Sequence, residues 1–374
     1  MKRTSLPIII FSVILILNCS KKDYSVEEKD GVKYIKNTGI ATGIYKPEAK
    51  FLFEITGPSG LNVPDSMKGF GAVIDIVCDE FDNFYFLDAL HATIKKYNKS
   101  GEFERYFPEQ SGNALESFEK PNQIILLQDT LVVFDMGPGK YVYYLTSGTF
   151  INAQLQMMGG NRPSYLNSDG KTITTAFIPG TAKIDSVEYF INDLCILDGK
   201  MKPEKIIMKI REPYDINFFL PNIMTSYSVK NDLISIAEAK GTDYRIHVFN
   251  SRGNRKYVIE KDCNKVEYNN YEKNLLNDFI TSSGFQGIDT SKVYYKKPVN
   301  SIEIDKKNRI WVMPSMIRTQ ANQDSFYIDI FQEGIFINRT VLDFVSGDET
   351  YKLRGNRLFV IAKDGRSVRV YDYE

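Results

Sequence analysis

The chain has 374 residues, of which 43% are hydrophobic and 13% aromatic, with 23 Tyr and 24 Phe against one Trp. This composition suits many short pleated strands in one β domain better than it suits helices. The formal net charge is +0, and removal of an N-terminal segment with Lys2 and Arg3 leaves 45 basic against 47 acidic residues. A nucleic-acid-binding protein usually shows a basic excess, so that class of function is excluded.

Residues 1–18 have the pattern of a signal peptide. Lys2 and Arg3 precede the twelve largely apolar residues 6–17, too few to span a bilayer, which takes about twenty. The segment ends at Ile16-Leu-Asn-Cys19 and resembles a bacterial lipoprotein signal, in which Cys19 is acylated and becomes the mature N-terminus. We therefore expect a protein of the bacterial cell envelope that is anchored to a membrane by lipid. The alternative is an ordinary secretory signal that is cleaved elsewhere.

The acylated cysteine opens a polar segment, residues 19–44. Its first part, residues 20–30, is highly charged and lacks the apolar content needed for packing. The sequence therefore predicts a flexible tether between the lipid and the folded domain.

A repeated pattern follows, in which a short apolar strand precedes a glycine. The five strands are 94–97, 141–144, 194–197, 245–249 and 327–331, and the glycines are Gly101, Gly148, Gly199, Gly253 and Gly334. The steps between the glycines are 47, 51, 54 and 81 residues, and the shorter ones match the length of a four-stranded unit. This periodicity predicts a β-propeller.

The first half of each copy reads as strand, hairpin and strand. In the first copy the strand 74–78 leads into the polar turn 79–83, and the fifth copy repeats this arrangement from Asp305. The third copy is the weakest. There we expect 172–177 to be the first strand, followed by a longer connection.

The long step before Gly334 contains a helical pattern. Apolar and aromatic residues recur at helical spacing within 268–280, at Tyr268, Tyr271, Leu275, Leu276 and Phe279. We predict a helical insertion over 263–287, between blades 4 and 5, with Asn269 or Asn270 as its cap. It would pack its apolar stripe on the propeller, or act as a lid or a partner-docking helix.

The two ends of the domain complete each other. Residues 367–371 form a sixth copy of the strand, but the chain ends at Glu374, before the outer strand that should follow. Residues 50–55 alternate as a strand and can supply it, which removes an unpaired sheet edge. The predicted fold over 45–374 is therefore all-β: a six-bladed β-propeller of four-stranded antiparallel blades, closed by pairing of an N-terminal strand with the C-terminal blade.

Several of these motifs resemble those of six-bladed propeller lipoproteins related to the NHL-repeat superfamily. The resemblance rests on the pattern over 79–88, the turn 98–101, Pro121 and the segment Ile310-Trp-Val312. It implies a ring of blades used mainly for binding, in a superfamily that also includes enzymes.

Ligand sites in propellers usually lie where the links between the second and third strands and between blades gather around the central channel. The polar residues of these links are the candidate ligand- or partner-binding residues. They are Asp88, His91, Asp135, Lys140, Glu238, Asp243, Arg318, Gln320, Lys363 and Arg366. The other interpretation of each is a solvated turn.

The sequence offers little for catalysis. It has two histidines, His91 and His247, in different units, so a three-histidine zinc site is excluded. Some six-bladed propellers hold calcium at the channel mouth and use it for lactone or ester hydrolysis. Asn122, Asn222 and Asn300 lie near predicted blade starts and are the candidate ligands for such an ion.

We therefore expect a membrane-tethered, non-catalytic propeller, monomeric and without a cofactor, that binds an unknown ligand or an envelope protein through its channel face. The alternatives are a calcium-dependent lactonase- or esterase-like hydrolase and a structural component of the envelope.

Overall fold

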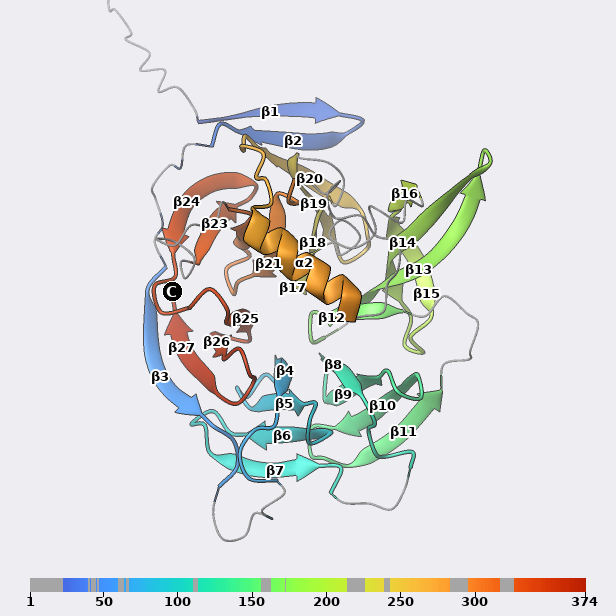
Figure 1. Cartoon of the computed structure of the whole chain (residues 1–374), viewed down its shortest axis with the longest axis vertical. Coiled ribbons are helices and arrows are strands. Elements are labelled where there is room, and N and C mark those ends of the chain that lie inside the picture. The colour runs from blue at the N-terminus through green and yellow to red at the C-terminus, as the bar shows by residue number, and fades with distance from the viewer. Residues whose placement is uncertain are drawn as a thin grey trace, which may run out of the picture.

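The computed structural model describes residues 23–39, 41, 45, 47–59, 64, 67–109, 114–155, 163–171, 173–213, 226–238, 243–282, 295–316 and 326–374. Their strands form six antiparallel blades arranged as a ring around a common centre (Figure 1). The predicted fold class, a six-bladed β-propeller of four-stranded blades, is confirmed.

The first five blades take their strands in chain order, from the innermost to the outermost. The first two blades consist of β4 (Val73–Cys78), β5 (Phe84–Asp88), β6 (Thr93–Tyr97) and β7 (Phe103–Phe107), then β8 (Pro121–Leu127), β9 (Thr130–Asp135), β10 (Lys140–Leu145) and β11 (Phe150–Leu155). The third consists of β12 (Ser164–Ser168), β13 (Thr174–Ile184), β14 (Val187–Leu197) and β15 (Pro203–Met208), with β16 (Arg211–Pro213) paired to β14. The fourth and fifth consist of β17 (Tyr227–Lys230), β18 (Leu233–Ala237), β19 (Tyr244–Asn250) and β20 (Arg255–Lys261), then β21 (Val299–Ile304), β22 (Ile310–Pro314), β23 (Tyr327–Gln332) and β24 (Ile335–Val341).

The sixth blade joins the two ends of the domain. It consists of β25 (Thr350–Arg354), β26 (Arg357–Ile361), β27 (Val368–Tyr373) and, as its outer strand, β3 (Ala49–Ile55). β3 is antiparallel to β27, with Ile55 opposite Val368 and Ala49 opposite Tyr373. The predicted closure is confirmed.

The hydrophobic core is divided among the junctions between blades. In the described part of the chain there are six clusters of buried apolar side chains, one at each junction. At the junction of the sixth and first blades, the rings of Phe84 and Phe359 meet edge to face with centroids 5.3 Å apart, and Ile55 of β3 joins the same cluster. Each blade therefore has both faces covered by its neighbours, and the predominantly apolar inner strands suit this environment.

Polar turns at the hairpins follow one scheme, in which a side-chain oxygen accepts two backbone N–H groups. Asp79 Oδ1 accepts from Phe81 and Asn83 at 2.9 Å each, and Asp305 Oδ1 accepts from Lys307 and Arg309 at 2.8 Å each. The same two-and-four-residue pattern recurs at Asn98, Asp169, Asp198 and Asn250. The predicted hairpins at 79–83 and after Asp305 are confirmed, and their carboxylates stabilise turns.

In the third blade the predicted repeat glycine, Gly199, lies two residues before the position that is equivalent to Gly101. Gly101 donates its N–H to Asn98 O at 2.9 Å with φ +80°, and the residue that does the same in the third blade is Met201, which donates to Asp198 O at 3.0 Å with φ 58°. The turn places a methionine in the left-handed region that glycine usually occupies.

The first strand of the third blade was also placed wrongly. β12 is the innermost strand, and residues 174–177 of the predicted first strand belong to β13, the second strand. β13 and β14 pair over 11 residues each and project beyond the ring (Figure 1). The longer connection expected after 177 is therefore a continuation of the strand.

The predicted flexible tether over 19–44 is wrong for residues 24–37. β1 (Tyr24–Lys29) and β2 (Val32–Asn37) form a hairpin whose turn, Asp30-Gly31, has φ values of 50° and 74°. β2 pairs in parallel with β20, which widens the fourth blade to six strands (Figure 1). A charged edge strand such as β1 contributes backbone hydrogen bonds and few apolar contacts, so composition did not reveal it.

Asn37 at the end of β2 links the hairpin to two blades. It is 3% exposed, and its amide nitrogen donates to Glu260 O at 3.1 Å and to Gly334 O at 3.0 Å. Its amide oxygen accepts the N–H of Phe336 at 2.8 Å. The N-terminal hairpin is thereby hydrogen-bonded to the fourth and fifth blades.

The predicted helix is present between the fourth and fifth blades as α2 (Asn270–Ser282). Asn269 caps it, because its side chain accepts the N–H of Glu272 at 2.9 Å and Glu272 accepts the N–H of Asn269 at 3.1 Å. Tyr271 was expected in the buried stripe, but it is 70% exposed. Among the described residues, α2 included, we find no helix with the length and apolar character needed to cross a membrane.

The Asn37 contacts predict that the hairpin contributes to global stability. Asn37→Ala should lower the free energy of unfolding by about 2–4 kcal/mol, since it removes the hydrogen bonds to Glu260 O and Gly334 O and leaves the buried Phe336 N–H without its acceptor. Urea denaturation of this variant measures the effect. Thr38→Ala, which loses one exposed hydrogen bond to Asp23 O, is the control and should change the free energy by less than about 1 kcal/mol. Equal stabilities of the two variants would show that the contacts of Asn37 do not contribute to the global stability of the propeller.

Candidate functional site

A cavity of about 560 Å³ lies among the innermost strands. β4, β8, β12, β17, β21 and β25, one strand from each blade, all contribute lining residues, and Figure 1 places these strands around the centre of the ring. A volume of this size is in the range of small-molecule binding sites. The cavity is therefore the candidate functional site.

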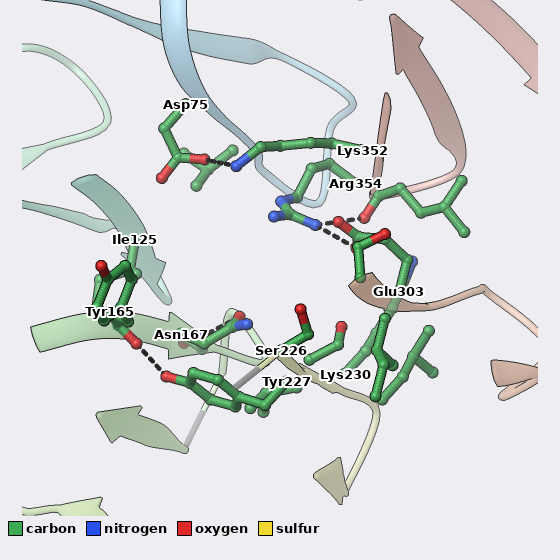
Figure 2. A pocket seen from close by; sticks show the side chains of 18 of the residues that line it. Asp75, Ile125, Tyr165, Asn167, Ser226, Tyr227, Lys230, Glu303, Lys352 and Arg354 are labelled. Carbon is green, nitrogen blue, oxygen red and sulfur yellow. Dashed lines mark hydrogen bonds and ion pairs between the residues drawn. The ribbon is translucent and has the colours of Figure 1, made fainter. Parts of the chain in front are cut away.

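Two ion pairs connect neighbouring blades across the cavity wall. Lys352 Nζ lies 2.6 Å from Asp75 Oδ1, and Arg354 Nη1 lies 2.8 Å from Glu303 Oε2 (Figure 2). Both cations come from β25, two residues apart on the same face of that strand. The sixth blade is thus linked to the first blade on one side and to the fifth on the other.

Lys230, at the end of β17, has a different environment. Its Nζ donates to the carbonyl oxygen of Gly355 at 2.9 Å, and among the described residues no carboxylate lies within 4.0 Å of it. Burial and the nearby Arg354 guanidinium lower the pKa of Lys230 to about 8, although Glu303 and Asp305 act in the opposite direction. Lys230 is therefore a cavity cation whose charge is only weakly compensated by the protein.

Two tyrosines form another part of the wall. Tyr165 has φ 51°, a left-handed conformation that is unusual for an aromatic residue, and its carbonyl oxygen accepts a hydrogen bond from the hydroxyl of Tyr227. The side chain of Tyr165 is 44% exposed, and both residues line the cavity with Asn167 (Figure 2). Strained backbone of this kind is often found at binding sites.

The eight predicted channel-face residues within the described ranges do not line this cavity. Asp88 and Asp135 are fully buried and have equivalent structural roles. Asp88 accepts the N–H groups of Gly71 and Ala72 at 2.8 and 2.9 Å, and Asp135 accepts those of Glu119 and Lys120 at 3.0 and 2.8 Å. Each carboxylate thus fixes the segment that leads into its own blade.

Lys140 and His91 support the same links. Lys140 Nζ donates to the carbonyl oxygens of Ala114, Leu115 and Ser117 at 2.8, 3.2 and 2.7 Å. His91 Nδ1 lies 2.8 Å from Asp88 Oδ2 and 2.9 Å from Lys95 Nζ. Both side chains hold loops together.

The other predicted residues are spread over the surface or fall outside the described ranges. Glu238 contacts Arg245 at 2.9 Å, whereas Asp243, Lys363 and Arg366 have side chains that are 70–75% exposed. Arg318, Gln320, Asn222 and Cys19 lie outside the residues that the structure describes. The structure does not bring the described members of the predicted set together into one site.

The asparagines proposed for calcium occupy related positions. Asn122 and Asn300 each sit where the register of the innermost strand shifts against the second strand. Of the two candidate asparagines that the structure describes, Asn300 lines the cavity and Asn122 does not. The amide group of Asn300 contacts Ser315 Oγ at 3.1 Å and Pro314 O at 3.4 Å. Within the described ranges there is no group of three or more His, Cys, Asp or Glu side chains that could hold a metal ion. These positions give little support to a shared site, and the calcium alternative stays a prediction.

The cavity charges had a signal in the sequence that was not used. Asp75, Lys230, Lys352 and Arg354 interrupt the apolar first strands of three copies of the repeat. A charged residue in a strand that is covered on both faces requires a partner or a cavity. The predicted binding residues all belong to predicted links between strands, so these four residues were not among them.

Comparison with solved structures supports the fold alone. The chain is similar to a protein from Bacteroides fragilis described as exported (TM-score 0.54, 10% identity, 91% of this chain and 98% of that chain). It is also similar to a member of the DUF4221 family from Bacteroides vulgatus (TM-score 0.50, 10% identity, 88% and 96%). Virginiamycin B lyase from Staphylococcus aureus is more distant, with a TM-score of 0.46, 9% identity and coverage of 87% and 99%. No protein-family model and no curated protein matches the chain.

The geometry around Asp88 predicts a structural effect with a defined pH dependence. Burial acts to raise the pKa of Asp88, but hydrogen bonds from Lys95, Ala72 and Gly71 outweigh it and lower the pKa to about 2, from 3.8. A carboxylate with a lowered pKa stabilises the fold above its unfolded-state pKa, and this contribution is lost as the pH falls through the folded-state pKa. Stability measured by urea denaturation should therefore decrease between about pH 4 and pH 2, by about 2 kcal/mol from this group.

Asp88→Asn should remove that pH dependence and lower the stability at pH 7 by about 3–5 kcal/mol, because Lys95 is left buried without its carboxylate. Asp343→Asn, at an exposed position, is the control and should be neutral. If both variants unfold at the same urea concentration, Asp88 does not stabilise the segment that leads into the first blade.

Proposed function

We propose that this protein is a membrane-tethered, non-catalytic propeller that binds a small molecule in the cavity at the centre of its ring. The observation that carries the proposal is the cavity of about 560 Å³, which is lined by apolar side chains together with polar and charged groups that converge from all six blades. This is the general character of ligand sites in proteins.

The polar groups of the cavity favour binding over proton transfer. Asp75 and Glu303 are each engaged by a cation, at 2.6 and 2.8 Å. Such pairs hold side chains in fixed positions and present a constant pattern of charge to a ligand. The hydrolase and structural-component alternatives have no comparable observation in their favour.

The tether belongs to the same proposal. If Cys19 carries lipid, four residues separate it from Tyr24, the first residue of β1. The five residue steps from Cys19 to Tyr24 span at most about 18 Å in an extended chain, so the hairpin would hold the propeller close to the membrane surface. The fourth blade would then be the part of the ring nearest to the lipid, because β2 is paired with β20.

Blocking the cavity tests the binding function. Asn167→Trp should abolish binding of small molecules in the cavity, since the indole would fill space that the amide leaves open. Asn152→Trp, on the exposed face of the outer strand β11, is the matched control and should leave binding intact. Crystals of the three proteins, soaked with one fragment library, provide the measurement. Fragments that gather around Lys363 and Arg366 and avoid the cavity would count against the proposal.

The anchor has a separate test. Cells grown with labelled palmitate should incorporate the label into the full-length protein, and Cys19→Ala should abolish incorporation and release the protein from the membrane fraction. Cys263→Ala removes an exposed cysteine within the propeller and is the control, with unchanged labelling. Membrane association that persists in the Cys19 variant would contradict the lipid anchor.

A further inference from the structure

The charged side chains that line the cavity differ in how fully partners within the protein compensate them. Asp75 pairs with Lys352, Glu303 with Arg354, and Glu349 with Arg369 at 2.5 Å. The carboxylate of Asp169 accepts two backbone N–H groups of its own turn, at 2.9 and 3.0 Å.

Lys230 stands apart from these pairs. Its one hydrogen bond is to Gly355 O, so within the described structure two of its three N–H donors have no partner. Lys140 shows the difference, because that buried ammonium donates to three carbonyl oxygens. Of the two carboxylates that act on Lys230, Glu303 is paired with Arg354 and Asp305 is paired with Arg309. This end of the cavity therefore has a local excess of one positive charge.

Resting on the proposed binding function, we propose that the ligand is a small organic monocarboxylate, with its carboxylate group held between Lys230 and Arg354. One negative charge would match the local excess, which a doubly charged phosphate would exceed. The cavity wall also includes Val77, Ile125 and Ile302, whose apolar side chains suit a carbon skeleton. A charge-assisted hydrogen bond from each cation would fix the orientation of the ligand.

The pH dependence of binding follows from the surroundings of Lys230. The groups that face it are Arg354 of β25, Glu303 of β21, Asp305 in the following turn and Cys78 of β4. Burial raises the pKa of the Cys78 thiol. The pKa of Lys230 is about 8, and an anion beside it raises that pKa. Binding should therefore take up protons above about pH 8, and the affinity should decrease as the pH rises further.

The experiment uses the mature full-length protein and pairs of probes that differ only in charge. Benzoate, phenylacetate, 3-phenylpropionate and hexanoate are each titrated beside the corresponding primary amide, with binding followed by calorimetry. We expect at least one acid to bind at least about tenfold more tightly than its amide, and to take up protons at about pH 8.5. Lys230→Met should weaken the binding of that acid at least about tenfold. The thermal unfolding midpoint of this variant should equal or exceed that of the wild type, because a poorly compensated buried charge has been removed.

Lys140→Met is the matched control, since it lies outside the cavity and should lower the thermal midpoint while leaving the affinity unchanged. A Lys230 variant that loses stability like the Lys140 variant, or that binds the acids as well as the wild type, would overturn the proposal. Amides that equal their acids in affinity would overturn it too, while cavity binding itself would stand. If no acid binds but fragments of other classes occupy the cavity, the carboxylate assignment fails and the proposed function survives. An empty cavity in the fragment soaks and in these titrations overturns both.

Discussion

The pairing of β3 with β27 is the constraint on which the rest of the structure depends. It joins Ala49–Ile55 to the last strand of the chain and brings the sixth blade against the first. The six apolar clusters are junctions between blades, so each is complete only when its two blades are in place. The Lys352–Asp75 ion pair crosses the same seam between β25 and β4. Closure of the ring therefore stabilises the core and completes the cavity wall in one step.

The amino-terminal hairpin of β1 and β2 pairs with the outer strand of the fourth blade, as β3 completes the sixth blade. Outer strands of a propeller have one unpaired edge, and β2 covers that of β20 in parallel orientation. Asn37 then satisfies backbone groups of the fourth and fifth blades from a position that is almost fully buried. The chain thus contacts the ring at two separate places before the first complete blade begins.

The ring itself could be predicted from the sequence, because spacing and turn chemistry are local signals. Asp79 and Asp305 form equivalent turns, and strand 50–55 lies where the truncated last blade requires it. The hairpin at 24–37 was missed although Asp30-Gly31 is a strong hairpin signal, because β1 has no buried apolar face. The site was missed for a different reason. Lys352 and Asp75 are 277 residues apart, and nothing local shows that they meet.

One electrostatic rule separates Lys230 from the other buried charges of this protein. A buried charge is stable only where partners replace the water that it has lost. Asp88, Asp135 and Lys140 meet this requirement with backbone groups of their own blades, which is why they hold loops even though their position in the sequence suggested a ligand site. Among the described residues, Lys230 has only one such partner. It lies near a second cation, Arg354, in a cavity large enough for a small molecule. Because Asp75, Glu303 and the three loop-holding charges are compensated within the fold, a bound anion is the simplest source of the partner that Lys230 lacks.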